Sequence, residues 1–441
     1  MIHQCAKRFG AATALAISIL AGTSATEYSL DSYLEKVERD NPDMALARQN
    51  AAAAIEGMKQ ARSALLPSVG VSAGYARNFI DIEKSYPVAS TGPGPLVWDD
   101  IDSNLDNELT MAAGLNFNLF NPEAIARYEQ AKRNQRIQGL VGEMTGDSIM
   151  VAAKKLYART QLALAVLDVR RETEETSREV FEDARRRYQA GVAIELDMRM
   201  AEVDWKTNAS STAEARKDAE LALMAFRSLA GIPQSEEIEL TESFDRLPDF
   251  PAAIPDLEDI LPNRSEYQIQ ILMKEIAEIS RKNAKGSFLP TIGGTFSYAS
   301  GFMGNGASFS DYDYNSLQLG LSVSVPVYTG GYRRSLMESA RIEMESSSLR
   351  VMKAQDEIEQ ELLSLYYRMQ EAGKRLESAR TLEEAAARAY DLARASLENG
   401  FGTQLAVSQA SARYSQASVN LRFAVYNYRS VYYDWELAVG E

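Results

Sequence analysis

Residues 65–75 read Leu-Leu-Pro-Ser-Val-Gly-Val-Ser-Ala-Gly-Tyr, and residues 288–298 repeat the pattern as Phe-Leu-Pro-Thr-Ile-Gly-Gly-Thr-Phe-Ser-Tyr. In both stretches a proline ends a helix-forming segment, because the residue before a proline is disfavoured in the α conformation, and an alternating strand follows. The two prolines lie 223 positions apart, whereas the later landmarks Gly191 and Gly400 lie 209 apart. The sequence therefore predicts two structural repeats that differ by about 14 residues in one loop.

Each repeat contains two predicted strands, near residues 67–77 and 108–120 in the first and near 290–302 and 316–328 in the second. Apolar side chains occupy every second position, and small or polar side chains occupy the positions between them. This alternation over about 9–11 residues is typical of outer-membrane barrel strands. A soluble antiparallel sheet with one solvated face is the alternative. Four such strands, with aromatic residues at their ends, favour the barrel.

Helices fill the rest of each repeat. The first repeat is expected to have an opening helix from about residue 41 to 66, a long helix from Pro122 to Gln189 and a return helix at 194–230. The second repeats them at about 265–289, 331–398 and 403–438. A helix of about 68 residues spans roughly 100 Å, and such length without internal proline is typical of coiled coils. In each repeat the opening and return helices together nearly match the long one. Each chain should therefore supply four columns of equal height.

The domain boundaries follow from composition. Residues 1–25 combine Lys7 and Arg8, an apolar run and a small-residue cleavage site, which is typical of a secretory signal peptide. The first repeat then covers residues 26–231 and the second covers residues 263–441. The intervening segment 232–262 is rich in proline, so we expect a non-helical belt across the columns.

The same composition excludes several functions. The only cysteine and the only histidine, Cys5 and His3, lie within the predicted signal peptide. We therefore expect no disulfide, no thiol or histidine catalysis, no ordinary zinc site, no cofactor and no enzymatic activity. Without Lys7 and Arg8 the chain has 45 basic and 62 acidic residues, a net charge of −17. An acidic chain with no basic stripe is not expected to bind nucleic acid.

The strand count predicts self-association. Open strand edges are not tolerated in lipid, and the smallest single-chain bacterial barrels have about eight strands. Several copies must therefore share one pore. Two copies would contribute 8 strands and 8 helical columns, and three copies would contribute 12 of each. The residue pattern alone leaves both open.

The order helix, Leu-Pro, strand, loop, strand, long helix, glycine turn, return helix occurs twice after a signal peptide. Local motifs accompany this order: Asn-Leu-Phe-Asn at 118–121, Pro-Val-Tyr-Thr at 326–329 and the turn Tyr-Gln-Ala-Gly-Val-Ala-Ile-Glu-Leu-Asp at 188–197. The chain thereby resembles the TolC family of outer-membrane efflux proteins over essentially its whole mature length.

The resemblance implies a mainly α protein with transmembrane β structure. A homotrimer would form a 12-stranded outer-membrane β-barrel and a 12-column periplasmic α-helical tunnel. It would be the exit duct of a tripartite efflux pump or type I secretion system, in the outer membrane of a Gram-negative-type bacterium. The implied partners are outer-membrane lipid, a periplasmic adaptor (membrane fusion) protein and an inner-membrane transporter. The sequence does not indicate the cargo.

The resemblance also implies two sites. The turns between the long and return helices would contact the adaptor; they comprise Gly191, Val192, Ala193 and Ile194, and Gly400, Phe401, Gly402 and Thr403. The alternative to adaptor contact is that these glycines only allow the chain to turn, as in any helix hairpin.

A tunnel constriction is expected just beyond these turns, at Asp197, Gln404, Ala406 and Gln409. The family often has aspartates there in its second repeat, where this chain has Ala406 and Gln409. A neutral amide constriction is therefore expected in place of an acidic, cation-binding ring.

Two other functions compete with the duct. A passive porin needs no energised partner, but porins do not carry about 270 helical residues. A periplasmic coiled-coil adaptor or scaffold would use the short strands in a soluble domain and would dissolve without detergent.

Overall fold

The computed structural model describes residues 26–80, 83–88, 97–102, 105–250, 253–306, 308–309 and 311–440. The predicted signal peptide, residues 1–25, lies outside this range. The chain divides into two compact units, which are described separately. Unit 1 comprises Met1–Asn41, Met150–Phe250 and Met369–Tyr433, and unit 2 comprises Pro42–Ile149, Pro251–Arg368 and Asp434–Glu441.

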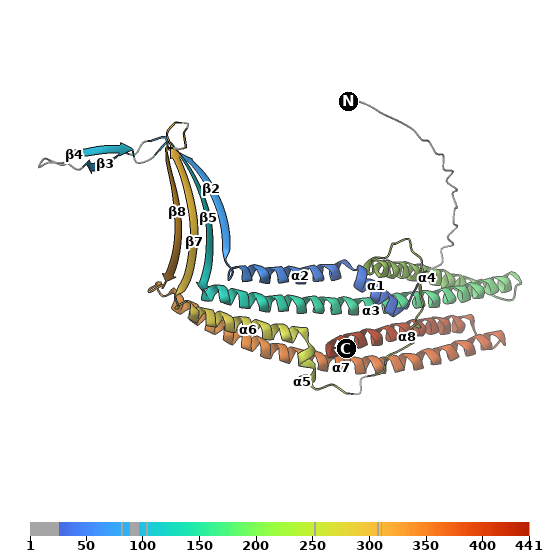
Figure 1. The fold of residues 1–441 in the computed structure, drawn as a ribbon. Helices are drawn as coiled ribbons and strands as arrows, with labels where there is room; N and C mark the ends of the chain where they lie inside the picture. The colour runs from blue at the N-terminus through green and yellow to red at the C-terminus, as the bar shows by residue number, and fades with distance from the viewer. Residues whose placement is uncertain are drawn as a thin grey trace, which may run out of the picture. The chain divides into compact units, whose positions relative to one another are not determined.

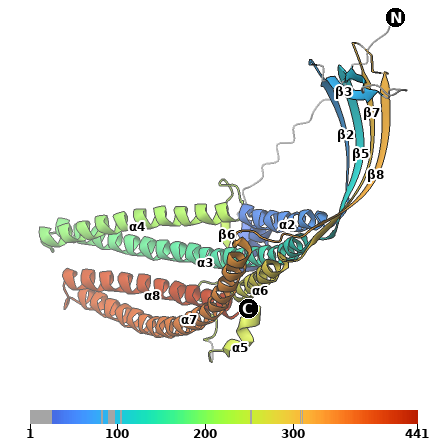
Figure 2. The same ribbon diagram turned by 90° about the vertical axis from the view of Figure 1, so that its left-hand side faces the viewer.

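Unit 2 contains a four-stranded antiparallel sheet in the order β2-β5-β7-β8 (Figures 1 and 2). Its strands are β2 (Ser68–Arg77), β5 (Asn107–Phe120), β7 (Thr291–Gly304) and β8 (Tyr312–Ser324). The last strand corrects the sequence prediction of 316–328, because it begins four residues earlier and ends at Ser324. Pro326 lies just beyond this end and has no N–H to donate to a strand ladder.

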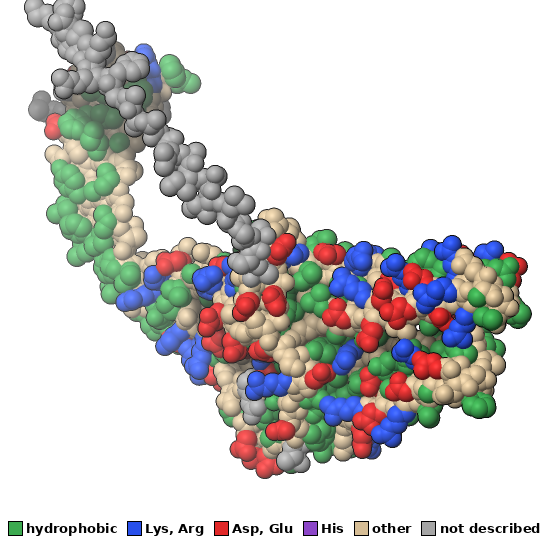
Figure 3. All heavy atoms as spheres, turned by 90° about the vertical axis from the view of Figure 1, so that its right-hand side faces the viewer, with side chains coloured by type: hydrophobic (Ala, Val, Ile, Leu, Met, Phe, Trp, Pro, Cys, Tyr) green, Lys and Arg blue, Asp and Glu red, His purple; other side chains and the backbone are tan. Residues whose placement is uncertain are grey.

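The register places the apolar residues of all four strands on one face of the sheet. Val69 pairs with Leu115, Leu115 with Phe296 and Phe296 with Leu319. The other face carries small and polar pairs such as Gly114 with Ser297. Leu319 is 80% exposed, and Figure 3 shows hydrophobic side chains gathered on the strand surface. A broad exposed apolar face opposite a polar one matches strands that separate lipid from an aqueous pore.

The long connection between β2 and β5 contains further strands. It contains β3 (Glu83–Val88) and β4 (Val97–Asp102), which pair antiparallel as a second sheet. Pro87 and the acidic residues Asp99 and Asp100 obscure a strand pattern in the sequence, because proline and aspartate are both depleted in strands. Strand pairing across the connection overrides this local preference.

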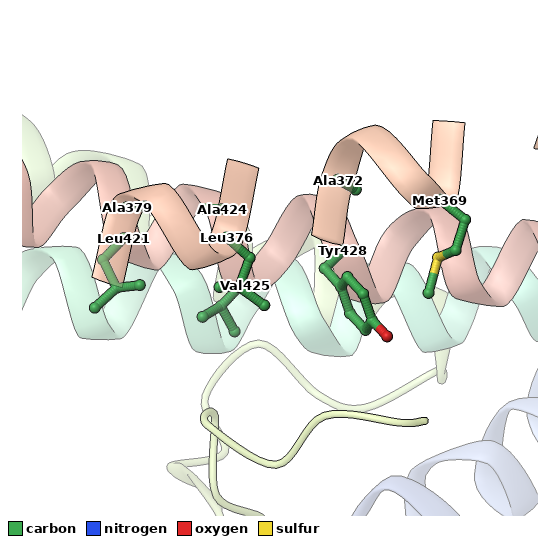
Figure 4. Packing of buried hydrophobic residues seen from close by; sticks show 8 residues of the cluster. All are labelled: Met369, Ala372, Leu376, Ala379, Leu421, Ala424, Val425 and Tyr428. Carbon is green, nitrogen blue, oxygen red and sulfur yellow. The ribbon is translucent and has the colours of Figure 1, made fainter. Parts of the chain in front are cut away.

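Four helices dominate the chain: α3 (Pro122–Gln189), α4 (Glu195–Leu229), α7 (Tyr332–Glu398) and α8 (Gln404–Val439). In unit 1, α4 packs along α3 through Leu167, Ala215 and Ala219. Also in unit 1, α7 and α8 share a buried core (Figure 4), which comprises Met369, Ala372, Leu376, Ala379, Leu421, Ala424, Val425 and Tyr428. The many alanines let the helix backbones approach closely.

In unit 2 the shorter helices α2 (Pro42–Ser63) and α6 (Ser265–Gly286) accompany the first part of α3. Ile269 and Leu272 of α6 pack against Ile137 and Leu140 of α3. Both short helices end three residues before their predicted ends at 66 and 289. In each case the three residues between the helix and the proline form a turn. The proline directly restricts only the last of these residues.

Unit 1 also contains elements that the sequence did not reveal. Strand β1 (Thr26–Tyr28) pairs in parallel with β6 (Ile238–Leu240), and α1 (Leu30–Asp40) follows β1. Tyr33 of α1 stacks on Phe226 of α4 at 3.9 Å between ring centroids. The Tyr157 hydroxyl donates to the Tyr28 carbonyl at 2.9 Å, and burial raises the pKa of Tyr157 to about 12.

The segment 232–262 was expected to lack helix, and this needs a correction. It contains β6, the one-turn helix α5 (Leu257–Ile260) and the start of the 3₁₀ helix η1 (Leu261–Asn263). In unit 2, Ile260 and Leu261 are buried against Leu362 and Trp435. Apolar packing thus holds a short helix despite the surrounding prolines. No described helix is both long and apolar enough to cross a membrane.

The two faces of β8 allow a direct test of lipid exposure. Leu319→Arg should destabilise the inserted protein by about 2–4 kcal/mol, because it places a charge at mid-strand on the apolar face. The neighbouring Gln318→Arg puts the same charge on the polar face and should be tolerated. Folding into lipid vesicles, followed by heat-dependent gel migration, measures both. Equal insertion of the two variants would contradict the assignment of the faces.

Candidate functional site

The turn between α3 and α4 is built by a left-handed glycine. Gly191 has φ +73°, a conformation that costs glycine far less than residues with a Cβ. The Gly191 N–H donates to the Tyr188 carbonyl and the Val192 N–H to the Arg187 carbonyl, both at 3.0 Å. These two hydrogen bonds satisfy carbonyl groups in the last turn of α3 and end the helix.

The turn between α7 and α8 repeats this geometry at Gly400, whose φ is +78°. The Gly400 N–H donates to the Leu397 carbonyl at 3.1 Å, and the Phe401 N–H donates to the Ser396 carbonyl at 3.0 Å. The duplicated sequence thus gives two equivalent helix ends. In Figure 2 both turns lie at the same end of unit 1.

The second turn is more tightly specified than the first. A Cβ on Gly402 would lie 2.8 Å from the Leu397 backbone nitrogen, so this position excludes any side chain. The Thr403 hydroxyl accepts from the Ala406 N–H at 3.2 Å, which caps the first turn of α8. At the equivalent place in the first turn, Ile194 makes no side-chain cap.

Both turns expose apolar side chains. Val192 is 76% exposed and Phe401 is 92% exposed, and Ile194 is also exposed. Leu196 and Leu405, each the second residue of its return helix, extend this apolar surface. Sequence reasoning missed these two leucines, because helical periodicity does not reveal which side of a helix start lacks a neighbour. We name this surface, residues 191–196 and 400–405, the apolar tip.

The four residues predicted to form a constriction lie in three different surroundings. Gln404 lines a cavity of about 140 Å³ with residues of α3 and α4, including Thr176 and Asp204. Ala406 and Gln409 line a groove of about 880 Å³ along α7 and α8. Asp197 is half-buried in the first turn of α4.

Polar contacts join the two helix hairpins within unit 1. Ser408 of α8 donates a hydrogen bond to Asp204 of α4. Thr173 of α3 donates to Ser415 of α8 at 3.1 Å, and the buried Arg429 donates to Gln161 at 2.7 Å. No pattern in the sequence predicts these pairs, because the register of helices distant in the chain depends on tertiary packing. A hydroxyl-lined seam therefore runs between the hairpins.

No metal centre accompanies these features. Across the part of the chain that the structure describes, no group of three or more His, Cys, Asp or Glu side chains is arranged to hold a metal ion. The candidate sites are surfaces and a seam.

The chain is similar to known proteins along most of its length. The model of a family described as "Outer membrane efflux protein" matches residues 33–232 and 268–431. The outer membrane protein TolC of Salmonella enteritidis is 22% identical over 426 residues, covering 93% of this chain and 83% of that protein. The alkaline protease secretion protein AprF of Pseudomonas aeruginosa is 24% identical and covers 72% of this chain and 64% of its own length.

Solved structures show the same fold. The Campylobacter jejuni CmeC outer membrane channel superimposes with a TM-score of 0.76 at 17% identity, covering 93% of this chain and 85% of that chain. The open Neisseria gonorrhoeae MtrE outer membrane channel gives a TM-score of 0.77 at 16% identity, with coverages of 93% and 88%.

The close approach at Gly402 predicts a local defect. Gly402→Ala should destabilise the α7–α8 turn by about 1–3 kcal/mol, because the added methyl group overlaps backbone atoms. The matched variant Gly373→Ala lies within α7, where a Cβ meets Tyr428 at 3.8 Å, and should be neutral or stabilising by up to about 1 kcal/mol. Amide hydrogen exchange at residues 396–407 measures the difference. Unchanged exchange in Gly402→Ala would refute the requirement.

Proposed function

Because the chain belongs to the outer membrane efflux protein family, we infer that it is an outer-membrane exit duct for efflux and type I secretion. The family match along both repeats carries this conclusion. The sheet with one apolar and one polar face fits the membrane part, and α3 and α7 fit the periplasmic tunnel. The relatives are channel proteins, and we propose a role without catalysis for this chain.

We propose that three copies assemble around one pore. The sheet ends at β2 on one side and at β8 on the other, and these two strands run in opposite directions. The β8 edge of one copy can therefore pair antiparallel with the β2 edge of the next. Three copies would close a 12-stranded barrel without an open edge, which lipid requires, and would bring 12 helical columns together.

We further propose that the apolar tip docks a periplasmic adaptor, which in turn connects the duct to an inner-membrane transporter. The exposure of Val192 and Phe401 supports this proposal, because solvent-exposed apolar groups gathered at a tight turn gain most from a partner. The cargo would then be selected by that transporter. Similar proteins include an alkaline protease secretion protein and a fusaric acid resistance protein, so the similarity does not assign a cargo.

The tip can be tested with charge. Val192→Asp and Phe401→Asp should each abolish export in cells, because a desolvated carboxylate opposes docking. Phe401→Leu keeps an apolar side chain and should retain export. Dye or substrate accumulation in cells reports export, and unheated gel migration reports assembly. Normal export by both aspartate variants would remove the tip from the docking surface.

The constriction can be tested by conductance. We propose that Gln409, exposed in the groove along α8, narrows the lumen with a neutral amide. Gln409→Ala should raise single-channel conductance in planar bilayers. Gln404→Ala should raise it less, because the Gln404 side chain lies in the cavity between the hairpins. Conductance equal to wild type in Gln409→Ala would count against this assignment.

A further inference from the structure

The junctions between strands and helices form a continuous region of unit 2. Asn118 of β5 donates to the Ala64 carbonyl just after α2, at 2.9 Å. A Cβ on Gly286, the last residue of α6, would lie 3.1 Å from the Pro122 ring that begins α3. We name this region the rim; it comprises residues 56–67, 118–127, 281–290 and 324–338.

Among the described residues, six cationic side chains of the rim form no ion pair; Arg281 and Arg333 are half-buried, and the other four are exposed. The exposed four are Arg62 at the end of α2, Lys282 and Lys285 at the end of α6, and Arg334 at the start of α7. These positive charges lie in a chain whose formal net charge is −15. Figure 3 shows Lys and Arg side chains gathered beneath the apolar strand surface.

The acids of the rim are committed to other cations. Glu56 binds Lys59 at 2.7 Å, Glu123 binds Arg127 at 2.5 Å and Glu338 binds Arg341 at 2.7 Å. The hydrogen bond from Arg341 lowers the pKa of Glu338. The acidic residues of the rim therefore do not pair with the four exposed cations.

Helix ends account for only part of this charge. Cations in the last turn, such as Arg62 and Lys285, favour the negative end of a helix dipole. Arg334 lies in the first turn of α7, where the dipole is positive and disfavours a cation, and that turn has no acidic residue. The cations of α2 and α6 lie near C-terminal helix ends, whereas that of α7 lies near an N-terminal end. What they have in common is a position close to the strands.

An exposed apolar segment, which we name the collar, connects β8 to α7 within the rim. Val327 is 94% exposed and Tyr328 is 86% exposed, directly after β8. Arg333 stabilises this connection, because it donates to the Pro326 carbonyl at 2.5 Å and lies over the Phe288 ring at 5.5 Å. Tyrosine rings beside basic side chains are typical of the boundary between hydrocarbon and headgroups.

We propose that the rim binds the phosphate headgroups of anionic phospholipids in the periplasmic leaflet. The proposal rests on the inferred placement of the strands in the outer membrane. The collar sets the depth of the boundary, and Arg62, Lys282, Lys285 and Arg334 lie where lipid phosphates would sit. Basic side chains beside a membrane attract anionic lipid by charge complementarity, and the exposed collar supplies the contact with acyl chains.

The experiment uses the full mature chain in nanodiscs of mixed phosphatidylethanolamine and phosphatidylglycerol. After mild detergent extraction, mass spectrometry measures the lipids that remain bound. Wild type should enrich phosphatidylglycerol about fivefold over its bulk fraction. The quadruple variant with Arg62→Gln, Lys282→Gln, Lys285→Gln and Arg334→Gln should fall to the bulk fraction.

A matched variant replaces four exposed cations of unit 1 with glutamine, and it should keep the enrichment; these are Arg216, Lys374, Arg380 and Arg388. Equal phosphatidylglycerol content in wild type and the quadruple variant would overturn the proposal. The quadruple variant should still form heat-sensitive oligomers, which would show that a loss of bound lipid does not come from failed assembly. Loss of pore formation by wild type itself would instead contradict the proposed function.

Discussion

The two unpaired edges of the four-stranded sheet are the constraint on which the architecture depends. Each edge strand presents backbone N–H and C=O groups, and hydrocarbon offers them no hydrogen-bonding partner. Strands β2 and β8 run in opposite directions, so an antiparallel pair between copies satisfies both edges at once. Each strand is joined to a helix in sequence, so closure of the proposed trimeric barrel would also bring the helices together around one axis.

The helices pack mainly within their own hairpins, and this arrangement is compatible with the proposed assembly. Their ion pairs are mostly local, such as Arg178 with Glu182 at 3.3 Å, and exposed pairs of this kind contribute about 0–1 kcal/mol. Alanine-rich packing joins each hairpin, as between Ala215 and Leu167. The hydrogen bonds between the hairpins involve hydroxyl groups, the Asp204 carboxylate and the Arg429 guanidinium. Apolar packing thus holds each hairpin together, while the seam between hairpins is polar.

The sequence predicted those parts of the fold that local patterns encode. Period-two alternation located all four strands of the main sheet, and Gly191 and Gly400 located the turns, since both signals depend only on neighbouring residues. The pairing of β1 with β6 depends on three-residue strands more than 200 positions apart, and no local pattern reveals it. The different surroundings of Gln404 and Gln409 likewise depend on which helix packs against each side of α8. Long-range packing decided what local chemistry left open.

The duplication conserves backbone geometry at the tips but leaves their surfaces different. Both turns need a left-handed glycine to end a long helix. Only the second adds a cap from Thr403 and a backbone approach at Gly402 that excludes a side chain. The first has Ala193 and the uncapped Ile194 in their place. In the proposed trimer these two kinds of turn would alternate around the tunnel mouth, so an adaptor would meet two different surfaces. Under that proposal the six contacts would be of two kinds, three at the capped turn and three at the uncapped one, because Thr403 and Gly402 have no counterpart in the first turn.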